Sequence, residues 1–262
     1  MSHWDKGSYE FTAAQLEPVA PVVADAVEPV AGQPTLDLAC GTGNVSLELA
    51  RRGASVTGFD GAPRLLKVAG ERATAEGFET TWVQGDLAEL PFADDSFEIV
   101  TSVFGVIFTG SPQQTAGEIA RVLRPQGRLA FTSWVEEGLF QHMQEMSKAA
   151  VASHFGQAPA DGDDKPFAWG DELAIRELFS EHGIAVQVEQ RDLVITEESA
   201  QVLNDRWFEE HPIWLTMHEL IGDENYAKLR EESLPVVEAA NQADDGSFSY
   251  TLRYLLSEGS PV

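Results

Sequence analysis

A glycine-rich turn that joins an apolar strand to a helix constrains the fold of this chain most strongly. The turn closes the run Thr35-Leu36-Asp37-Leu38-Ala39-Cys40-Gly41-Thr42-Gly43, and the residues from Val45 onward have the pattern of a helix. Glycine lets the backbone close a tight turn and lets a ligand approach it closely. The run therefore predicts a nucleotide-type crevice at the carboxyl end of a sheet strand.

Asp37 indicates which kind of nucleotide suits this turn. A dinucleotide brings a pyrophosphate, which binds N–H groups at a helix N-terminus and is repelled by an anion beside them. The dinucleotide fingerprint G-x-G-x-x-G also fails, because Ser46 stands at its third position, and this disfavours a nicotinamide-dependent oxidoreductase. A carboxylate suits instead a phosphate-free cofactor with cationic groups, such as S-adenosylmethionine. The alternative is that Asp37 is only a strand-end residue of another α/β turn.

Four further segments have the pattern of strands. Residues 54–60 end in Asp60, at the spacing where a βαβ unit returns to the same sheet edge and a carboxylate can bind both hydroxyls of a ribose. Residues 80–83 precede another acid, Asp86, and residues 97–105 form the nearly continuous apolar run of a strand buried on both faces. A helix then ends, the chain turns at residues 124–127, and a fifth strand follows.

As an ordered set, four motifs resemble those of a known enzyme family: D-L-A-C-G-T-G, G-F-D, G-D-x-x-x-L-P-F-x-D-x-S-F and R-V-L-R-P-x-G. The family is the class I S-adenosylmethionine-dependent methyltransferases, and the chain is most similar to their small-molecule branch, which is related to the ubiquinone and menaquinone methyltransferases. The resemblance covers residues 9–134 well and the rest loosely. Three positions depart from the pattern. Ala39 replaces the first glycine of the family's loop, Gln126 replaces a glycine in the turn before the fifth strand, and Leu87 stands where the family often has alanine.

The resemblance implies both a fold and a set of site residues. The fold is α/β, with a doubly wound, mostly parallel seven-stranded sheet. The mostly helical pattern of residues 197–245 indicates in addition a lid inserted before the last strand. Asp37, Gly41 and Gly43 would surround the methionine moiety, and Asp60 would bind the ribose. Asp86 and the backbone of Leu87 would contact the adenine, and Val103 would line the methionine amine. Gly61 completes the implied cofactor-binding set. The candidate acceptor-binding residues are Phe104, Trp134, Trp207 and Trp214.

The chain is expected to form one domain, since no second glycine fingerprint or internal repeat occurs and 43% hydrophobic content can supply one sizeable core. Its predicted parts are an N-terminal helical segment (residues 1–30), the cofactor-binding core (31–135), helices with a mobile loop near residues 156–166 (136–183) and the helical lid (197–245). Two further strands are expected, one at residues 184–188 and a last one at residues 247–256.

Aromatic and histidine residues gather after residue 134. Trp207 and Trp214 lie near helical spacing, which fits a core stripe as well as a lid that closes over the acceptor. If the reaction uses a general base, His142 is the first candidate because it lies just beyond the fifth strand, and His211 is the second. Each histidine can equally have a structural role. No grouping of His, Cys, Asp and Glu has metal-ligand spacing, so no metal is expected.

A formal charge of −26 argues against nucleic acids and anionic membranes as partners. Most of the 43 acidic residues follow residue 135, where they either form a solvated surface or attract an amine-bearing acceptor. The single cysteine, Cys40, excludes an internal disulfide and suits a small buried position in the turn. No stretch has the length of a membrane span and the first ten residues lack a signal pattern, so a soluble, cytoplasmic protein is expected.

The mechanism implied by this cofactor depends chiefly on positioning. Methyl transfer is an in-line displacement at a sulfonium, and aligning the reactants can contribute up to about 7 to 11 kcal/mol. The sequence therefore predicts a methyltransferase that acts on a small organic acceptor. The alternative is a catalytically idle S-adenosylmethionine-binding protein that serves a partner. The sequence does not name the acceptor, the methylated atom or the oligomeric state.

Overall fold

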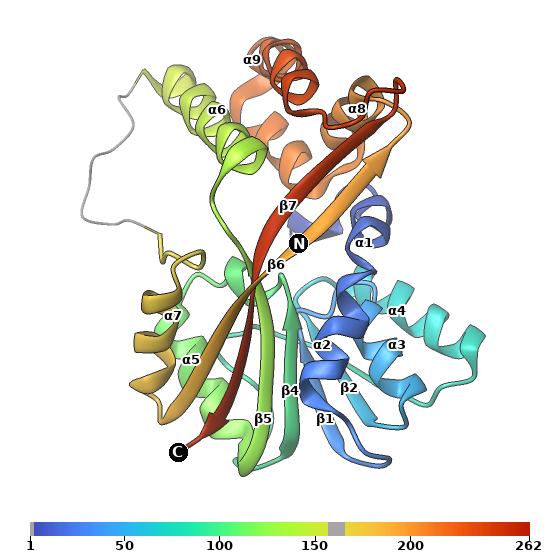
Figure 1. The fold of residues 1–262 in the computed structure, drawn as a ribbon, viewed down its shortest axis with the longest axis vertical. Coiled ribbons are helices and arrows are strands. Elements are labelled where there is room, and N and C mark those ends of the chain that lie inside the picture. The colour runs from blue at the N-terminus through green and yellow to red at the C-terminus, as the bar shows by residue number, and fades with distance from the viewer. Residues whose placement is uncertain (1–2, 157–165) are drawn as a thin grey trace. The chain divides into compact units, whose positions relative to one another are not determined.

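A computed structural model gives the fold of the chain and describes residues 3–156 and 166–262 (Figure 1). The mobile loop expected near residues 156–166 lies almost wholly outside the described residues. Along the chain the elements are η1 (His3–Asp5), α1 (Glu10–Leu16), α2 (Val19–Val27), β1 (Pro34–Leu38), α3 (Asn44–Arg51), β2 (Ser55–Asp60), α4 (Pro63–Glu76), β3 (Thr81–Gln84), β4 (Phe97–Val103), η2 (Val106–Phe108), α5 (Pro112–Val122), β5 (Leu123–Trp134), α6 (Gly138–Phe155), α7 (Glu172–Ser180), β6 (Ile184–Glu197), α8 (Ala200–Glu210), α9 (Pro212–Ala240) and β7 (Phe248–Pro261).

Seven strands form one sheet in the order β3-β2-β1-β4-β5-β7-β6. β1 pairs in parallel with both β2 and β4, β2 with β3, and β4 with β5, whereas β7 runs antiparallel to β5. The strand order therefore reverses at β1. Ligands of such sheets bind outside the carboxyl ends of the strands at this switch point. The predicted doubly wound, mostly parallel seven-stranded sheet is confirmed.

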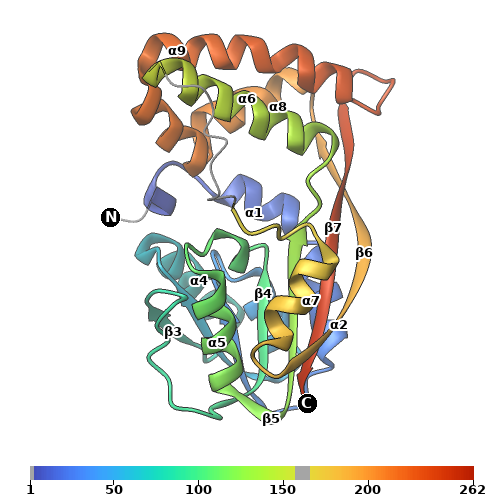
Figure 2. The same ribbon diagram turned by 90° about the vertical axis from the view of Figure 1, so that its left-hand side faces the viewer.

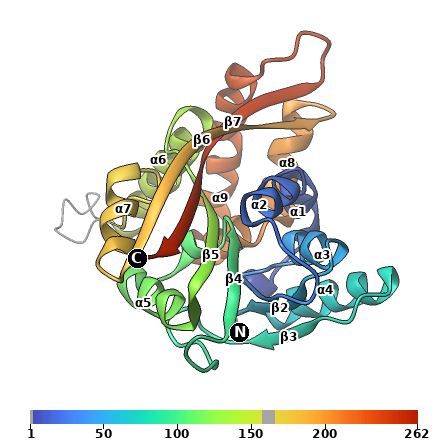
Figure 3. The same cartoon turned by 60° about the horizontal axis from the view of Figure 1, so that its bottom comes forward.

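The described chain divides into two compact units. The first, here called the sheet unit, consists of Leu16–Val135, Phe167–Arg191 and Tyr254–Val262. Its core includes fully buried side chains from neighbouring strands, among them Leu36, Phe59 and Phe131. Figure 3 shows α2 and α3 on one face of the sheet and α5 and α7 on the other. Helices on both faces bury both faces of the central strands, which explains the apolar run of β4.

Local signals set several helix boundaries in the sheet unit. α3 begins after Gly43, whose φ of 85° lies in the left-handed region. α4 has Pro63 in its first turn, where the missing N–H removes no helical hydrogen bond, and it ends at Gly77 with φ 78°. α7 begins after Asp171, whose side chain accepts hydrogen bonds from the backbone N–H groups of two residues in the first turn.

The second compact unit, here called the helical unit, consists of Met1–Gln15, Glu136–Pro166 and Asp192–Arg253. Within it α6 and α8 both pack against α9 (Figure 2). α9 is interrupted at Gly222, where φ 75° and ψ 169° are not helical. α8 and α9 precede the last strand, where the lid insertion was expected. The single-domain organisation with this lid stays a prediction, because a compact unit need not be a domain that folds alone.

Three details of the sheet differ from the sequence-based expectation. Residues 124–127 are part of β5 but interrupt its pairing with β4, which passes from Phe97–Leu123 directly to Ile99–Arg128. β6 and β7 extend well beyond residues 184–188 and 247–256. The middle of β6 is largely exposed, and the sequence therefore gives little alternation there. Within the described ranges, no helix has the length and apolarity needed to cross a membrane.

Candidate functional site

Asp37 lies on β1, one residue before the end of the strand, and is completely buried. Its Oδ2 accepts a hydrogen bond of 2.5 Å from Ser46 Oγ, and its Oδ1 accepts one of 3.2 Å from Thr101 Oγ1. Burial raises the pKa of Asp37 from 3.8 to about 7, although the two hydroxyl groups oppose this shift by stabilising the anion. The carboxyl group therefore changes its charge near neutral pH.

The glycine loop (residues 39–43) contains three left-handed residues, with φ of 49° at Ala39, 54° at Gly41 and 85° at Gly43. This conformation is strained for alanine, so the departure at Ala39 requires support from its surroundings. Gly105 provides space for it, because a Cβ atom at Gly105 would lie only 2.4 Å from the Cβ of Ala39. The turn after β4 thus accommodates the unusual alanine of the loop.

Gly43 and Cys40 are shaped by packing. A Cβ atom at Gly43 would approach the Cβ of Ala69 on α4 to 3.1 Å and the ring of Trp82 on β3 to 3.3 Å. Gly43 is therefore required for its backbone conformation and for the contact between the loop and α4. Cys40 is buried, and burial raises the pKa of its thiol, which keeps it protonated and unreactive.

Asp60 ends β2 beside the glycine loop and is 7% exposed. Its Oδ2 accepts a 2.8 Å hydrogen bond from the N–H of Gly41, and its Oδ1 accepts one of the same length from the N–H of Ala62. Asp60 thus links the loop to the start of α4, and its role at a ribose stays a prediction.

The predicted ribose and adenine positions lie after β2 and β3. Gly61 is exposed, and the nearest atom to a Cβ built there is the carbonyl oxygen of Gly85 at 3.5 Å. Asp86 is exposed, and its Oδ1 accepts the N–H of Ala88 at 2.9 Å in a short turn. Leu87 is half-buried and packs on the core. A glycine and an exposed turn thus lie at the ends of β2 and β3, and their role at a ribose and an adenine stays a prediction.

Aromatic rings meet at the carboxyl ends of β4 and β5. Val103 ends β4 and pairs with Thr132, whose Oγ1 accepts the N–H of Phe104 at 2.9 Å. The ring of Phe104 is only 3% exposed and stacks on Trp134, with centroids 3.7 Å apart and planes at 3°. Tyr254 contacts Phe104 edge-on at 5.5 Å. The structure therefore brings Phe104 and Trp134 together, with Phe104 mainly supporting the half-buried Trp134.

The other predicted residues belong to the helical unit. His142 is exposed, and its Nδ1 lies 2.7 Å from the carbonyl oxygen of Gly138. His211 precedes α9, and its Nδ1 accepts the N–H of Ile213 at 3.2 Å. Burial lowers the pKa of His211 to about 4, so this histidine is neutral at physiological pH.

The two predicted tryptophans of the helical unit differ in burial. Trp214 is 9% exposed and stacks on Phe208, with ring centroids 4.7 Å apart, whereas Trp207 is half-buried. The Trp214 contact is what a core stripe requires. The acceptor-binding role of both residues stays a prediction.

The chemistry of the glycine loop fits a cationic, phosphate-free cofactor. Two carboxyl groups, Asp37 and Asp60, lie at the loop, and Ser46 donates to Asp37 at the position where a dinucleotide site needs glycine. A pyrophosphate would meet these acids, whereas a sulfonium and an ammonium group would be attracted by them. The residues therefore fit S-adenosylmethionine. No group of three or more His, Cys, Asp or Glu side chains in the described ranges is arranged to hold a metal ion.

Sequence reasoning missed two residues that shape this site. Thr101 gives no local signal within an apolar strand, yet it lies directly opposite Asp37 in the register of β1 and β4. Arg72 near the end of α4 donates hydrogen bonds to the loop carbonyl of Thr42 and to Asn44, and an isolated arginine on a helix has the appearance of a solvated side chain. In the sequence, Ser46 stood out only because it occupies the third glycine position of the dinucleotide motif G-x-G-x-x-G. The structure shows that its hydroxyl group donates a hydrogen bond to Asp37.

Comparison with known families and relatives gives consistent matches. A family model described as a methyltransferase domain matches residues 36–131. An uncharacterized protein of Mycobacterium tuberculosis is 30% identical over 260 residues, which is 97% of this chain and 92% of that protein. A demethylmenaquinone methyltransferase of Clavibacter sepedonicus is 34% identical over 177 residues, which is 64% of this chain and 71% of the relative.

Solved structures match the fold at lower sequence identity. A putative methyltransferase from Bacillus halodurans has a TM-score of 0.63 and 18% identity, over 93% of this chain and 99% of its own. The phosphoethanolamine N-methyltransferase 2 of Haemonchus contortus, solved with phosphomonomethylethanolamine and S-adenosylhomocysteine, has a TM-score of 0.58 and 19% identity, over 94% of this chain and 53% of its own. These two likenesses concern the fold.

Proposed function

Because the chain belongs to the class I S-adenosylmethionine-dependent methyltransferases, we propose that it transfers the methyl group of S-adenosylmethionine to a small organic acceptor. The observation that carries this proposal is the acid-lined glycine loop at the switch point of the sheet. Asp60 holds the loop N–H of Gly41 at 2.8 Å, and Asp37 is buried at the base of the same loop. This arrangement combines close backbone approach with negative charge.

Each predicted cofactor residue has a role that its position allows. Asp60 accepts hydrogen bonds from the ribose hydroxyls, and Gly61 lets the sugar approach the backbone. Asp86 and the backbone of Leu87 bind the adenine at the end of β3. Asp37, with Gly41, Gly43 and Val103, surrounds the methionine end, where its negative form attracts the ammonium group.

The catalytic contribution of the chain is mainly positional. When bound, S-adenosylmethionine supplies an electrophilic methyl group that a nucleophile on the acceptor displaces in line. The protein holds the two reactants in alignment and excludes water, an effect worth up to about 7 to 11 kcal/mol. His142 and His211 remain the candidate bases. A His211 pKa near 4 makes it a weak base at neutral pH, so His142 is the better candidate for an acceptor that must lose a proton.

The acceptor class can be narrowed by experiment. The Clavibacter sepedonicus relative is named for demethylmenaquinone, so a quinol analogue belongs in a panel together with a primary amine, a phenol and a thiol. The first test is calorimetric titration of the purified protein with S-adenosylhomocysteine. The second follows the mass of each acceptor after incubation with S-adenosylmethionine. We expect micromolar cofactor binding and methylation of at least one acceptor.

Two variants make the test specific to the loop. Asp60→Asn removes charge at the proposed ribose site, whereas Asp94→Asn neutralises an acid that is 75% exposed beside Arg121, near the amino end of β4. We expect weaker binding only for Asp60→Asn. Absence of cofactor binding by the wild-type protein would refute the proposal. Tight binding without turnover of any acceptor would favour the idle binding protein over the enzyme.

A further inference from the structure

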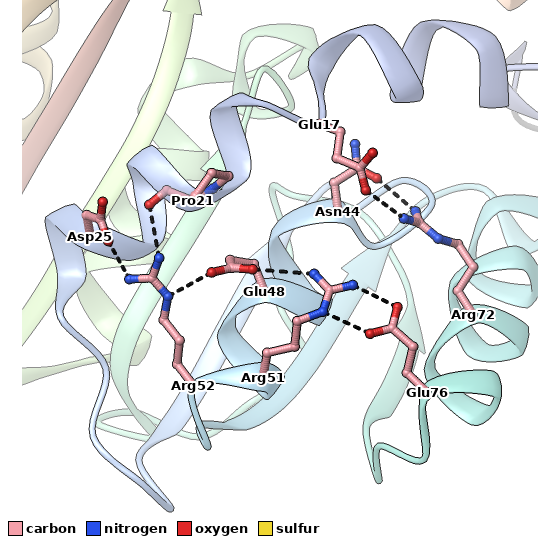
Figure 4. A network of polar contacts seen from close by, with 9 residues as sticks. All are labelled: Glu17, Pro21, Asp25, Asn44, Glu48, Arg51, Arg52, Arg72 and Glu76. Carbon is pink, nitrogen blue, oxygen red and sulfur yellow. Dashed lines mark hydrogen bonds and ion pairs between the residues drawn. The ribbon is translucent and has the colours of Figure 1, made fainter.

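The guanidinium group of Arg72 on α4 points toward Asn44 and Glu17 (Figure 4), and it also donates a hydrogen bond to the glycine loop. Its Nη1 donates to the carbonyl oxygen of Thr42 at 2.7 Å and to Asn44 Oδ1 at 2.8 Å, and lies 3.3 Å from Thr42 Oγ1. We propose that Arg72 is a positioning residue that holds the loop in its cofactor-binding shape. This inference rests on the proposed function of the loop.

The loop needs such support because its backbone is unusual. Left-handed conformations at Ala39, Gly41 and Gly43 are strained or entropically unfavourable, and they persist when surrounding groups fix them. Asp60 holds the N–H of Gly41 from the side of β2. Arg72 holds the carbonyl of the next residue, Thr42, from the side of α4. The two side chains therefore fix adjacent loop residues from different elements.

Fixing the loop in advance should strengthen cofactor binding. A loop that is already ordered loses less conformational entropy when a ligand binds, so its affinity is higher for the same contacts. Arginine suits this task because its planar guanidinium holds the N–H groups of Nη1 in fixed directions toward Thr42 and Asn44, whereas the ammonium of lysine is carried on a flexible stem. The third partner of Arg72, Glu17, lies 3.6 Å from Nη2 and is 58% exposed, so it contributes little energy.

Arg51 offers a matched control on the adjoining helix. It joins α3 to α4 through a bidentate pair with Glu76 at 2.7 and 2.8 Å, and it also contacts Glu48 at 3.3 Å (Figure 4). The Arg51 side chain is 41% exposed and that of Arg72 is 32% exposed. Both arginines thus stabilise the packing of α3 and α4 through similar surface contacts. Arg72 differs in that it binds the glycine loop.

The test compares Arg72→Gln, Arg72→Lys and Arg51→Gln by calorimetric titration with S-adenosylhomocysteine and by thermal unfolding without ligand. We expect Arg72→Gln to weaken binding about tenfold, the loss typical of one hydrogen bond to a charged group, and Arg72→Lys to recover part of it. Arg51→Gln should bind within about twofold of wild type while its Tm falls by a similar amount to that of Arg72→Gln. Binding and stability are thereby separated.

Several results would overturn the inference. Wild-type affinity in Arg72→Gln would show that the loop holds its shape without the arginine. If Arg72→Gln and Arg51→Gln lose the same affinity for S-adenosylhomocysteine, the loss comes from weaker helix packing in general and not from the glycine loop. If Arg72→Gln does not fold, Asn44→Ala removes one acceptor instead, and unchanged affinity in both Asn44→Ala and Arg72→Lys would refute the proposal. Failure of the wild-type protein to bind would refute the proposed function together with this inference.

Discussion

Replacing Asp37 by asparagine should change how the stability of the protein depends on pH. Asp37 is completely buried, and its carboxyl group has a pKa of about 7 in the folded protein against 3.8 in the unfolded chain. Asparagine has nearly the same shape and cannot ionise. The hydroxyl groups of Ser46 and Thr101 can rotate to accept as well as donate, so the amide keeps hydrogen-bonding partners.

The size of the effect follows from the two pKa values. Between pH 3.8 and about 7 the folded protein keeps the Asp37 proton whereas the unfolded chain has lost it. Because the unfolded state then binds fewer protons, wild-type stability falls as the pH rises through this window. Each pH unit between the two pKa values lowers the free energy of unfolding of the wild type by about 1.4 kcal/mol, so the whole window lowers it by about 4 kcal/mol at most. Asp37→Asn does not lose this stability.

Urea unfolding at several pH values from 4 to 8, without ligand, measures the difference. The free energy of unfolding of Asp37→Asn minus that of wild type should increase by up to about 4 kcal/mol across this range. Other titrating groups cancel in this difference. Asp94→Asn, which neutralises an exposed acid, should show no comparable trend. Parallel curves for wild type and Asp37→Asn would refute the buried-carboxyl reasoning. A lower affinity of Asp37→Asn for S-adenosylhomocysteine would agree with the proposed role at the ammonium group.

Three other substitutions test separate parts of the structure. Asp60→Ala should weaken S-adenosylhomocysteine binding at least about tenfold in calorimetry, because charge-assisted hydrogen bonds are lost; unchanged affinity in a folded variant would remove Asp60 from the site. Trp214→Ala should lower the free energy of unfolding by about 3 to 5 kcal/mol, since this ring is buried against Phe208. Normal stability of this variant with slow single turnover would instead support the lid. Gly105→Ala places a methyl group 2.4 Å from Ala39 and should lower Tm, and adding Ala39→Gly should restore part of the loss; strictly additive effects would contradict this contact.

Local sequence patterns predicted most strands of the sheet unit. The strands that end at Asp37 and Asp60 were predictable because apolar runs, a glycine turn and strand-end acids lie within a few residues of one another. The length of β6 was not predictable, since its exposed middle has little periodicity. That residues 124–127 interrupt the pairing within β5, instead of preceding the strand, depends on the register with β4 and has no local signal.

The sequence by itself determined the fold class, the family and the acids beside the glycine loop, because these depend on residue types at short spacing. Tertiary structure decided how those acids are held. Thr101 reaches Asp37 only through the register of two strands, and Gly105 makes room for Ala39 only because two strand ends meet. Arg72 reaches Thr42 because α4 packs beside the loop. Such contacts join residues about 30 to 65 positions apart. No local sequence pattern indicates them, because they form only when the whole sheet has packed.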